Sequence, residues 1–117
     1  MDRLYVFCCP VCGNVTLSYG RPSVKCCGEE LLPLAAAPLA VRPAVSEMDG
    51  EFLLMFDCPM SKADYIAAVV VERYDAVSLF RLFAEGPAQV RVPQLRGSRV
   101  YVVRRREGAA ELSMAAL

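Results

Sequence analysis

The chain has 117 residues, of which 56% are hydrophobic and 22% charged, so it can bury a core and is not a disordered segment. Thirteen basic and thirteen acidic side chains give a formal net charge of zero, which argues against bulk attraction to nucleic acid or to an anionic membrane. The sequence contains no histidine, which excludes imidazole metal ligands and the usual Ser-His and Cys-His nucleophile pairs.

The first part of the chain predicts short strands that alternate with cysteine-bearing turns. Strands are expected at 4–7 and 15–20, and the segment 23–31 contains two adjacent cysteines. The segment 33–43 has three prolines and is interpreted as a linker. We therefore expect a small module of residues 1–36 and a larger domain of residues 37–117.

The larger domain has the pattern of an all-β fold. Turns are expected at Asp49–Gly50 and Tyr74–Asp75. The triple valine in 64–74 favours a strand over a helix. Six short strands with turns between them indicate an antiparallel sandwich or barrel, and the final segment 107–117 is expected to be loose or a short helix. The predicted strands are 44–48, 51–57, 64–74, 77–83, 88–92 and 98–106.

Charge is distributed unevenly along this domain. Residues 37–86 carry four basic and eight acidic side chains, a net of −4, and residues 87–117 carry six basic and two acidic, a net of +4. We expect these charges to neutralise each other across strands or between subunits, rather than to form a nucleic-acid patch at 104–106.

The cysteines give the clearest functional signal. Cys9 and Cys12 are separated by two residues, Cys26 and Cys27 are adjacent, and a glycine follows each pair. Adjacent cysteines are poor disulfide partners, because neighbouring Cα atoms lie about 3.8 Å apart and disulfides need roughly 4.4–6.8 Å. Two pairs at this spacing predict a four-thiolate site for one iron or zinc ion per chain. Cys8 is interpreted as a strand residue or a reserve ligand.

Metal binding would also explain how so small a module can fold. A segment of about 36 residues buries too little apolar surface to fold alone, and metal ligation can contribute on the order of 10 kcal/mol to folding. We expect a cytoplasmic protein, where thiols stay reduced, so that six cysteines point to a metal rather than to disulfides. We see no signal-peptide core at the start and no apolar run long enough to cross a membrane.

These residues resemble a known family. The pattern "CPVCGN…VKCCGEEL" resembles the desulforedoxin-like, rubredoxin-type iron module of the desulfoferrodoxins. In that family the module precedes an immunoglobulin-like β-sandwich that reduces superoxide at a second iron. The segments "VRPAVSEMDGEF" and "CPMSKADYIAAVVV" resemble the family's sandwich sequences, so the resemblance covers roughly residues 4–107.

The same resemblance implies that the second iron site has been lost. The family holds this iron with four histidines and one cysteine, and a chain without histidine cannot supply them. Cys58 is then a small buried hydrophobe and Asp64 an exposed or capped turn residue. The family's histidine positions fall at Val41, Cys58, Asp64 and Arg105, its cysteine at Val102 and its lysine at Ala40.

Three functions are compatible with this sequence. The leading one is a desulfoferrodoxin-like metal-binding protein without catalytic residues, in which the four-cysteine centre is structural or transfers one electron to a protein partner. The second is a homodimeric binding or assembly protein with structural zinc, since relatives in this family are commonly dimers. The third is a divergent superoxide-related oxidoreductase with a site rebuilt from Cys58, Asp64 and nearby arginines.

Overall fold

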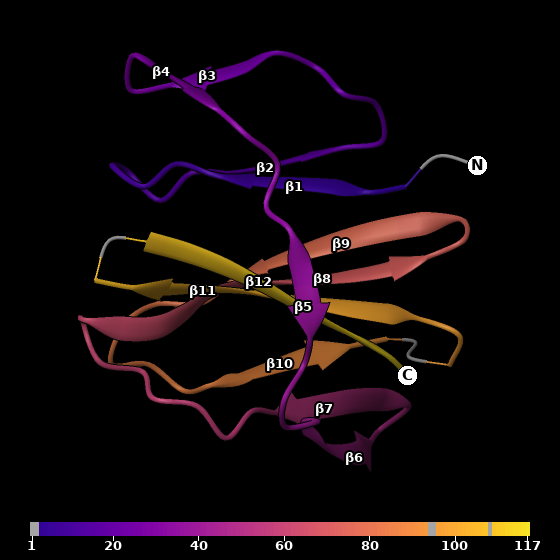
Figure 1. Ribbon diagram of the computed structural model, residues 1–117. Coiled ribbons are helices and arrows are strands. Elements are labelled where there is room, and N and C mark those ends of the chain that lie inside the picture. The colour runs from indigo at the N-terminus through magenta and orange to yellow at the C-terminus, as the bar shows by residue number, and fades with distance from the viewer. Residues whose placement is uncertain (1–2, 94–95, 108) are drawn as a thin grey trace.

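The structure is a computed structural model that describes residues 3–93, 96–107 and 109–117. Every regular element in these ranges is a β-strand, and none of them contains a helix that could cross a membrane. Figure 1 shows the strands in four layers. They are β1 (Tyr5–Cys8), β2 (Val15–Ser18), β3 (Val24–Cys26), β4 (Glu29–Leu31), β5 (Ala36–Pro38), β6 (Ala44–Met48), β7 (Glu51–Met55), β8 (Asp64–Arg73), β9 (Ala76–Arg81), β10 (Gln89–Val92), β11 (Arg99–Arg106) and β12 (Ala109–Ala116).

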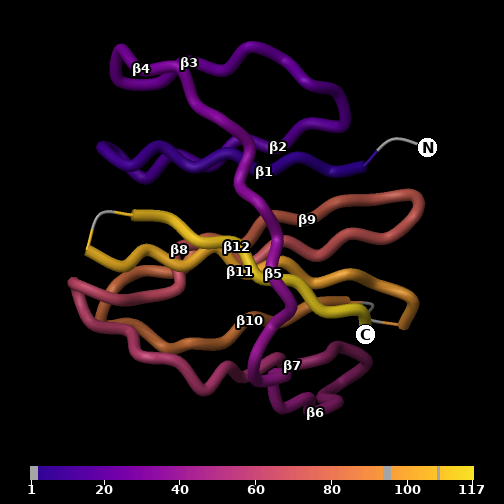
Figure 2. Tube along the Cα trace, in the orientation of Figure 1, coloured from indigo at the N-terminus to yellow at the C-terminus, as the bar shows by residue number. Residues whose placement is uncertain are grey.

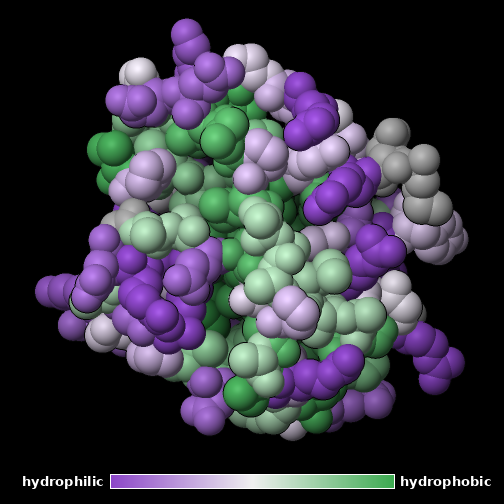
Figure 3. Space-filling model, viewed as in Figure 1, coloured by the Kyte–Doolittle hydropathy of each residue, from purple (hydrophilic) through white to green (hydrophobic). Residues whose placement is uncertain are grey.

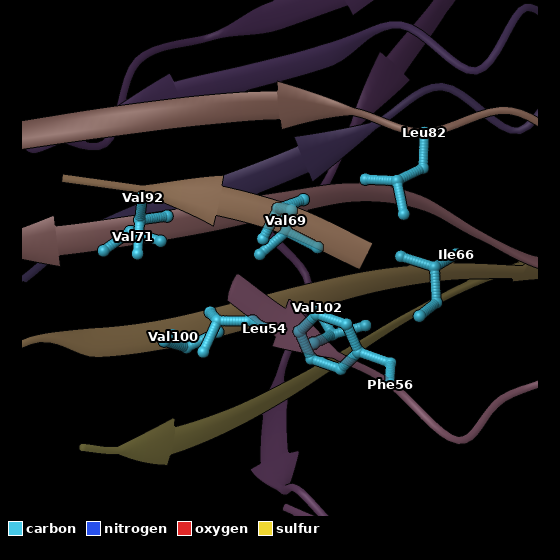
Figure 4. Packing of buried hydrophobic residues seen from close by; sticks show 10 residues of the cluster. Leu54, Phe56, Ile66, Val69, Val71, Leu82, Val92, Val100 and Val102 are labelled. Carbon is cyan, nitrogen blue, oxygen red and sulfur yellow. The ribbon is translucent and has the colours of Figure 1, made fainter. Parts of the chain in front are cut away.

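Two sheets form a sandwich. The smaller has the strand order β10-β7-β6, and the larger has the order β5-β12-β11-β8-β9. Every strand pair is antiparallel except β5–β12. Buried side chains from both sheets meet between them, including Leu54 and Val92 from one sheet and Val69 and Val102 from the other (Figure 4). The predicted antiparallel sandwich is confirmed.

The β1–β2 hairpin covers the outer face of the larger sheet. Val6 from β1 packs in one buried cluster with Val70 from β8 and Val103 from β11. The tube in Figure 2 shows this hairpin between the sandwich and the β3–β4 hairpin. The larger sheet therefore has a second core on its other side, which joins the N-terminal segment to the sandwich.

A β-bulge in β8 keeps Ile66 on the face of the sandwich interior. The pairing of β8 with β11 shifts where Val103 lies opposite Ala68 and Arg104 lies opposite Ile66, so Ala67 is the extra residue. Ile66 and Val69 both face the sandwich interior although three positions separate them. In a regular strand such residues point to opposite faces, and the bulge restores the alternation.

Two sequence-based expectations are wrong. The segment 33–43 is more than a linker, because β5 pairs with β12 and the Leu34 amide donates to the Val6 carbonyl at 2.8 Å. Figure 3 shows apolar side chains along this crossing between the module and the sandwich. Within the segment 107–117, residues 109–117 are neither loose nor helical, because β12 pairs along β11 over its whole length and buries Leu112 and Ala115, while residue 108 lies outside the described residues. Its alanines favour helix in isolation, and sheet pairing overrides that preference.

The turn predictions are confirmed. Asp49 and Gly50 have φ of 51° and 80° and join β6 to β7 as a two-residue hairpin turn. Tyr74 and Asp75 are the two residues between β8 and β9, where Arg73 lies opposite Ala76.

The opposite charges of the two segments also meet within the chain. Arg91 lies 3.7 Å from Glu51, and both Arg104 and Arg106 contact Asp64.

Candidate metal centre

Four cysteine sulfurs converge at one end of the N-terminal module. The Sγ atoms of Cys9, Cys12, Cys26 and Cys27 all lie within 4.8 Å of one another. Cys12 and Cys26 are 3.5 Å apart, and Cys26 and Cys27 are 4.0 Å apart. A tetrahedral site with metal–sulfur bonds of about 2.3 Å places its sulfurs about 3.8 Å apart. The spacing of the four sulfurs therefore fits a single iron or zinc ion.

The first sulfur pair is held by a tight turn after β1. The Gly13 amide donates to the Cys9 carbonyl and the Cys9 amide donates to the Asn14 carbonyl, each at 2.9 Å. Gly13 has φ of +77°, a conformation that side-chain-bearing residues rarely adopt. The glycine after the Cys-x-x-Cys pair is thus explained by the turn that brings both sulfurs to one side.

The second pair forms a hairpin turn. Cys26 is the last residue of β3 and lies opposite Glu29, so Cys27 and Gly28 are the two turn residues. Their φ values of 54° and 80° are those of a type I′ turn, which suits the twist of the flanking strands. The adjacent cysteines are therefore a strand residue and a turn residue, and this difference lets both sulfurs point toward one centre.

The environment separates the pKa values of the sulfurs. Backbone N–H groups of Cys12 and Val11 point at the Cys9 sulfur and lower its pKa to about 6, against the opposing effect of burial. Hydrogen bonding to Cys12 and Cys9 raises the pKa of Cys26 to about 12, and the same neighbours raise the pKa of Cys27. Without a metal, Cys9 thus ionises readily, whereas Cys26 and Cys27 resist ionisation. Because metal ligation requires deprotonated thiols, binding a metal here releases protons.

The centre is open on one side. Cys9 is buried and Cys26 is half-buried, whereas Cys12 and Cys27 are exposed. Val11, between Cys9 and Cys12, is 68% exposed. The arrangement gives solvent or a partner molecule direct access to two of the four sulfurs.

Cys8 does not belong to the cluster. Its side chain is buried in the core between β1 and the larger sheet, where desolvation raises its pKa. Neighbouring residues of a strand point to opposite faces, so Cys8 and Cys9 diverge. The interpretation of Cys8 as a strand residue is confirmed.

The positions that the resemblance assigned to iron ligands form no cluster of three or more metal-binding side chains among the residues that the structure describes. Val41 is exposed, and Val102 is buried in the sandwich core. Cys58 packs against that core, as expected of a small hydrophobe, but it is partly rather than fully buried.

The expectation that Asp64 is an exposed or capped turn residue is wrong. Asp64 begins β8 and is half-buried, with a carboxylate that accepts two hydrogen bonds from Arg104 at 2.6 and 2.7 Å. These bonds lower the pKa of Asp64.

Two groups of residues at the module–sandwich contact were not found from the sequence. The Arg105 guanidinium donates to the Pro10 carbonyl at 2.8 Å, so it contacts the turn between Cys9 and Cys12. Separately, the hydroxyls of Tyr19 and Tyr101 donate to the two carboxylate oxygens of Glu72 at 2.7 and 2.9 Å. The alternation of β11 places Tyr101 and Arg105 on one face, but nothing in the sequence says that the module covers that face.

No protein-family model matches the sequence, and no curated protein is detectably similar to it. Among solved structures, the chain is similar to the superoxide reductase from Treponema pallidum, with a TM-score of 0.77 and 18% sequence identity. The match covers 98% of this chain and 99% of that chain. The resemblance drawn from the cysteine pattern is thereby confirmed at the level of the fold, including the small cysteine module and the β-sandwich.

Proposed function

We propose that this protein binds one iron or zinc ion through Cys9, Cys12, Cys26 and Cys27, and that the ion stabilises the N-terminal module. The observation that carries the proposal is the convergence of four sulfurs within 4.8 Å on two glycine-followed turns. The β3–β4 hairpin supports it as well, because both of its strands have only three residues and none of its side chains is fully buried. So small a hairpin has little apolar surface with which to hold its place, and ligation by Cys26 and Cys27 supplies the attachment.

The choice of metal decides between a structural and a redox role. Four thiolates accept either ion, but iron in such a cage exchanges one electron and zinc does not. The exposed Cys12 and Cys27 sulfurs would give an electron-transfer protein a short path to an iron centre. Cys9 and Cys26 would keep the opposite side of the ion away from water.

We further propose that the sandwich has lost superoxide reductase activity at its second site. The described residues offer no second group of three ligands there. Arg104 and Arg106 instead surround Asp64, so the carboxylate is already neutralised by two cations. A site of this charge opposes the entry of a metal ion.

Metal analysis of the purified protein tests both statements. We expect one metal ion per chain, and no superoxide turnover above background even with iron in excess. Charge-transfer absorption in the visible range indicates iron, and a colourless loaded protein indicates zinc. Cys27→Ser should lose most of the metal, whereas the matched Cys58→Ser variant should retain it. Two metal ions per chain, or retention by Cys27→Ser, would contradict the proposal.

A homodimer is the second part of the proposal, and the β6–β7 hairpin is its candidate interface. β6 is an edge strand of the smaller sheet, and Val45, Met48 and Met55 on this hairpin are 47%, 43% and 37% exposed. Edge strands and exposed apolar side chains favour pairing with another chain. Light scattering should give the mass of a dimer for the native chain, and Val45→Lys should give a monomer. A monomeric native chain would refute this part.

The compartment is proposed on the cysteines alone. All six thiols are free, and the proposed metal site needs four of them reduced. We therefore propose a cytoplasmic location, which fractionation of the native host would test.

A further inference from the structure

We propose that Arg105 is the counter-cation of the four-cysteine centre and positions its first turn. The inference rests on the metal site proposed above. It assigns a second role to β11, whose residues otherwise build the two cores of the larger sheet.

The contacts of Arg105 are directed at the Cys9–Gly13 turn. Its Nη2 donates to the Pro10 carbonyl at 2.8 Å. Its Nη1 lies 2.7 Å from the point that a Cβ atom at Gly13 would occupy. The guanidinium therefore fills the space that glycine leaves open, directly behind a turn that supplies two of the four sulfurs. A larger residue at position 13 would displace it.

The charge of Arg105 has no other partner in the described part of the chain. No carboxylate there lies within 4.0 Å of it, and its remaining contact is to the Tyr65 hydroxyl at 3.5 Å. Its Nε is buried, with no hydrogen-bond partner among the described residues. Partial burial of a cation is unfavourable unless a negative charge lies close by. A neutral side chain would suit this position better if the neighbouring turn stayed neutral.

The loaded centre supplies the missing charge. A divalent ion with four thiolates carries a net double negative charge, and the turn that Arg105 contacts contains two of those thiolates. The neighbouring arginines cannot do the same. Arg104 and Arg106 alternate with Arg105 along β11, and both contact Asp64. Only the middle arginine of the three faces the module, beside Tyr65.

The sign of the effect follows from this charge. A fixed cation favours the more negative form of a nearby centre, so Arg105 should strengthen metal binding. If the ion is iron, Arg105 should also raise the reduction potential, because the ferrous centre is more negative than the ferric one. Groups next to metal ligands commonly change affinity by about 10–100-fold when they are removed.

The test uses the full chain and competition with a chromophoric chelator for zinc. Arg105→Gln should bind zinc about 10–100-fold more weakly than the native chain, and Arg105→Lys should lose less because it keeps the charge. Arg106→Gln is the matched control, since it removes the same charge from the opposite face of β11, and it should change affinity less than about threefold. In the iron-loaded protein, Arg105→Gln should shift the midpoint potential to a more negative value, and Arg106→Gln should not.

The outcomes separate the two proposals. Absence of zinc and iron binding by the native chain would overturn the proposed metal site and this inference together. Binding by the native chain with equal affinity in Arg105→Gln would overturn the role of Arg105 alone. An equal loss in Arg105→Lys and Arg105→Gln would overturn the assignment as a counter-cation. Thermal unfolding of the metal-free variants distinguishes a loss of fold from a loss of affinity.

Discussion

The contact between the β1–β2 hairpin and the larger sheet can be tested by a pair of neighbouring valines on β8. Val69 faces the sandwich interior and Val70 faces the hairpin, and both side chains have 0% exposure. The two residues share a strand, a volume and a degree of burial. They differ only in which core they belong to, so alanine substitutions compare the two cores directly.

We expect both substitutions to destabilise the protein by similar amounts. Valine to alanine removes two buried carbon groups, worth about 0.8 kcal/mol each, or about 1.6 kcal/mol in transfer free energy. The cavity left behind adds to this, because a packed interior relaxes only in part. The total loss in the free energy of unfolding should be about 2–3 kcal/mol for Val69→Ala and for Val70→Ala.

Urea unfolding followed by circular dichroism measures both values, with native and variant chains in the same metal state. A single transition with equal losses would show that the hairpin and the sandwich unfold as one unit. A loss below about 1 kcal/mol for Val70→Ala beside a full loss for Val69→Ala would refute the second core. The module of residues 1–36 would then be an independent domain, as a strict division at residue 36 predicts.

Three further substitutions test local features. In Gly28→Ala the new Cβ meets no atom within 4 Å, but the residue must adopt φ near +80°, so the free energy of unfolding measured by thermal unfolding should fall by about 1–2 kcal/mol. Gly20 has open space around it and no positive φ, so Gly20→Ala should leave the free energy of unfolding unchanged. The pKa of Asp64 is lower in the folded protein than in the unfolded chain, so its ionised carboxylate stabilises the fold at pH values above the ordinary carboxyl pKa. This contribution is lost as the pH falls through the pKa of Asp64 in the folded protein. In urea unfolding, the difference in stability between the native protein and Asp64→Asn should therefore shrink from pH 7 to pH 3. Burial and Glu72 raise the pKa of Tyr19 to about 12, so the contribution of Tyr19 to stability is complete below about pH 10 and is lost as the pH rises toward 12. Ultraviolet titration of Glu72→Gln should show the pKa of Tyr19 moving toward about 10. An unchanged pKa would contradict the contact between Tyr19 and Glu72.

The four-cysteine cluster and most strands could be predicted because their signals are local. Two glycine-followed cysteine pairs indicate both the clustered sulfurs and the turns that hold them, and the Asp49–Gly50 turn determines the pairing of its two strands. The C-terminal strand could not be predicted in this way. Its alanine-rich sequence has weak strand character, and it becomes a strand because β11 and β5 lie on either side of it.

The contacts that join the module to the sandwich could not be predicted from the sequence for a similar reason. Glu72 and Tyr19 are far apart in the chain, and each is an ordinary surface-type residue when considered alone. Arg105 resembles its two arginine neighbours in sequence and differs from them only in the face of β11 that it occupies. Such a difference becomes visible once the hairpin is placed on the sheet.

The extra residue at Ala67 has a consequence for how this chain can change in length. Elsewhere in β8, inserting or deleting one amino acid would exchange inward-facing and outward-facing side chains along the rest of the strand. Ala67 stands outside that alternation, so its deletion would leave Ile66 and Val69 facing the same interior and restore an unbroken ladder with β11. Within this strand, position 67 is therefore where natural variants of different length are expected to differ.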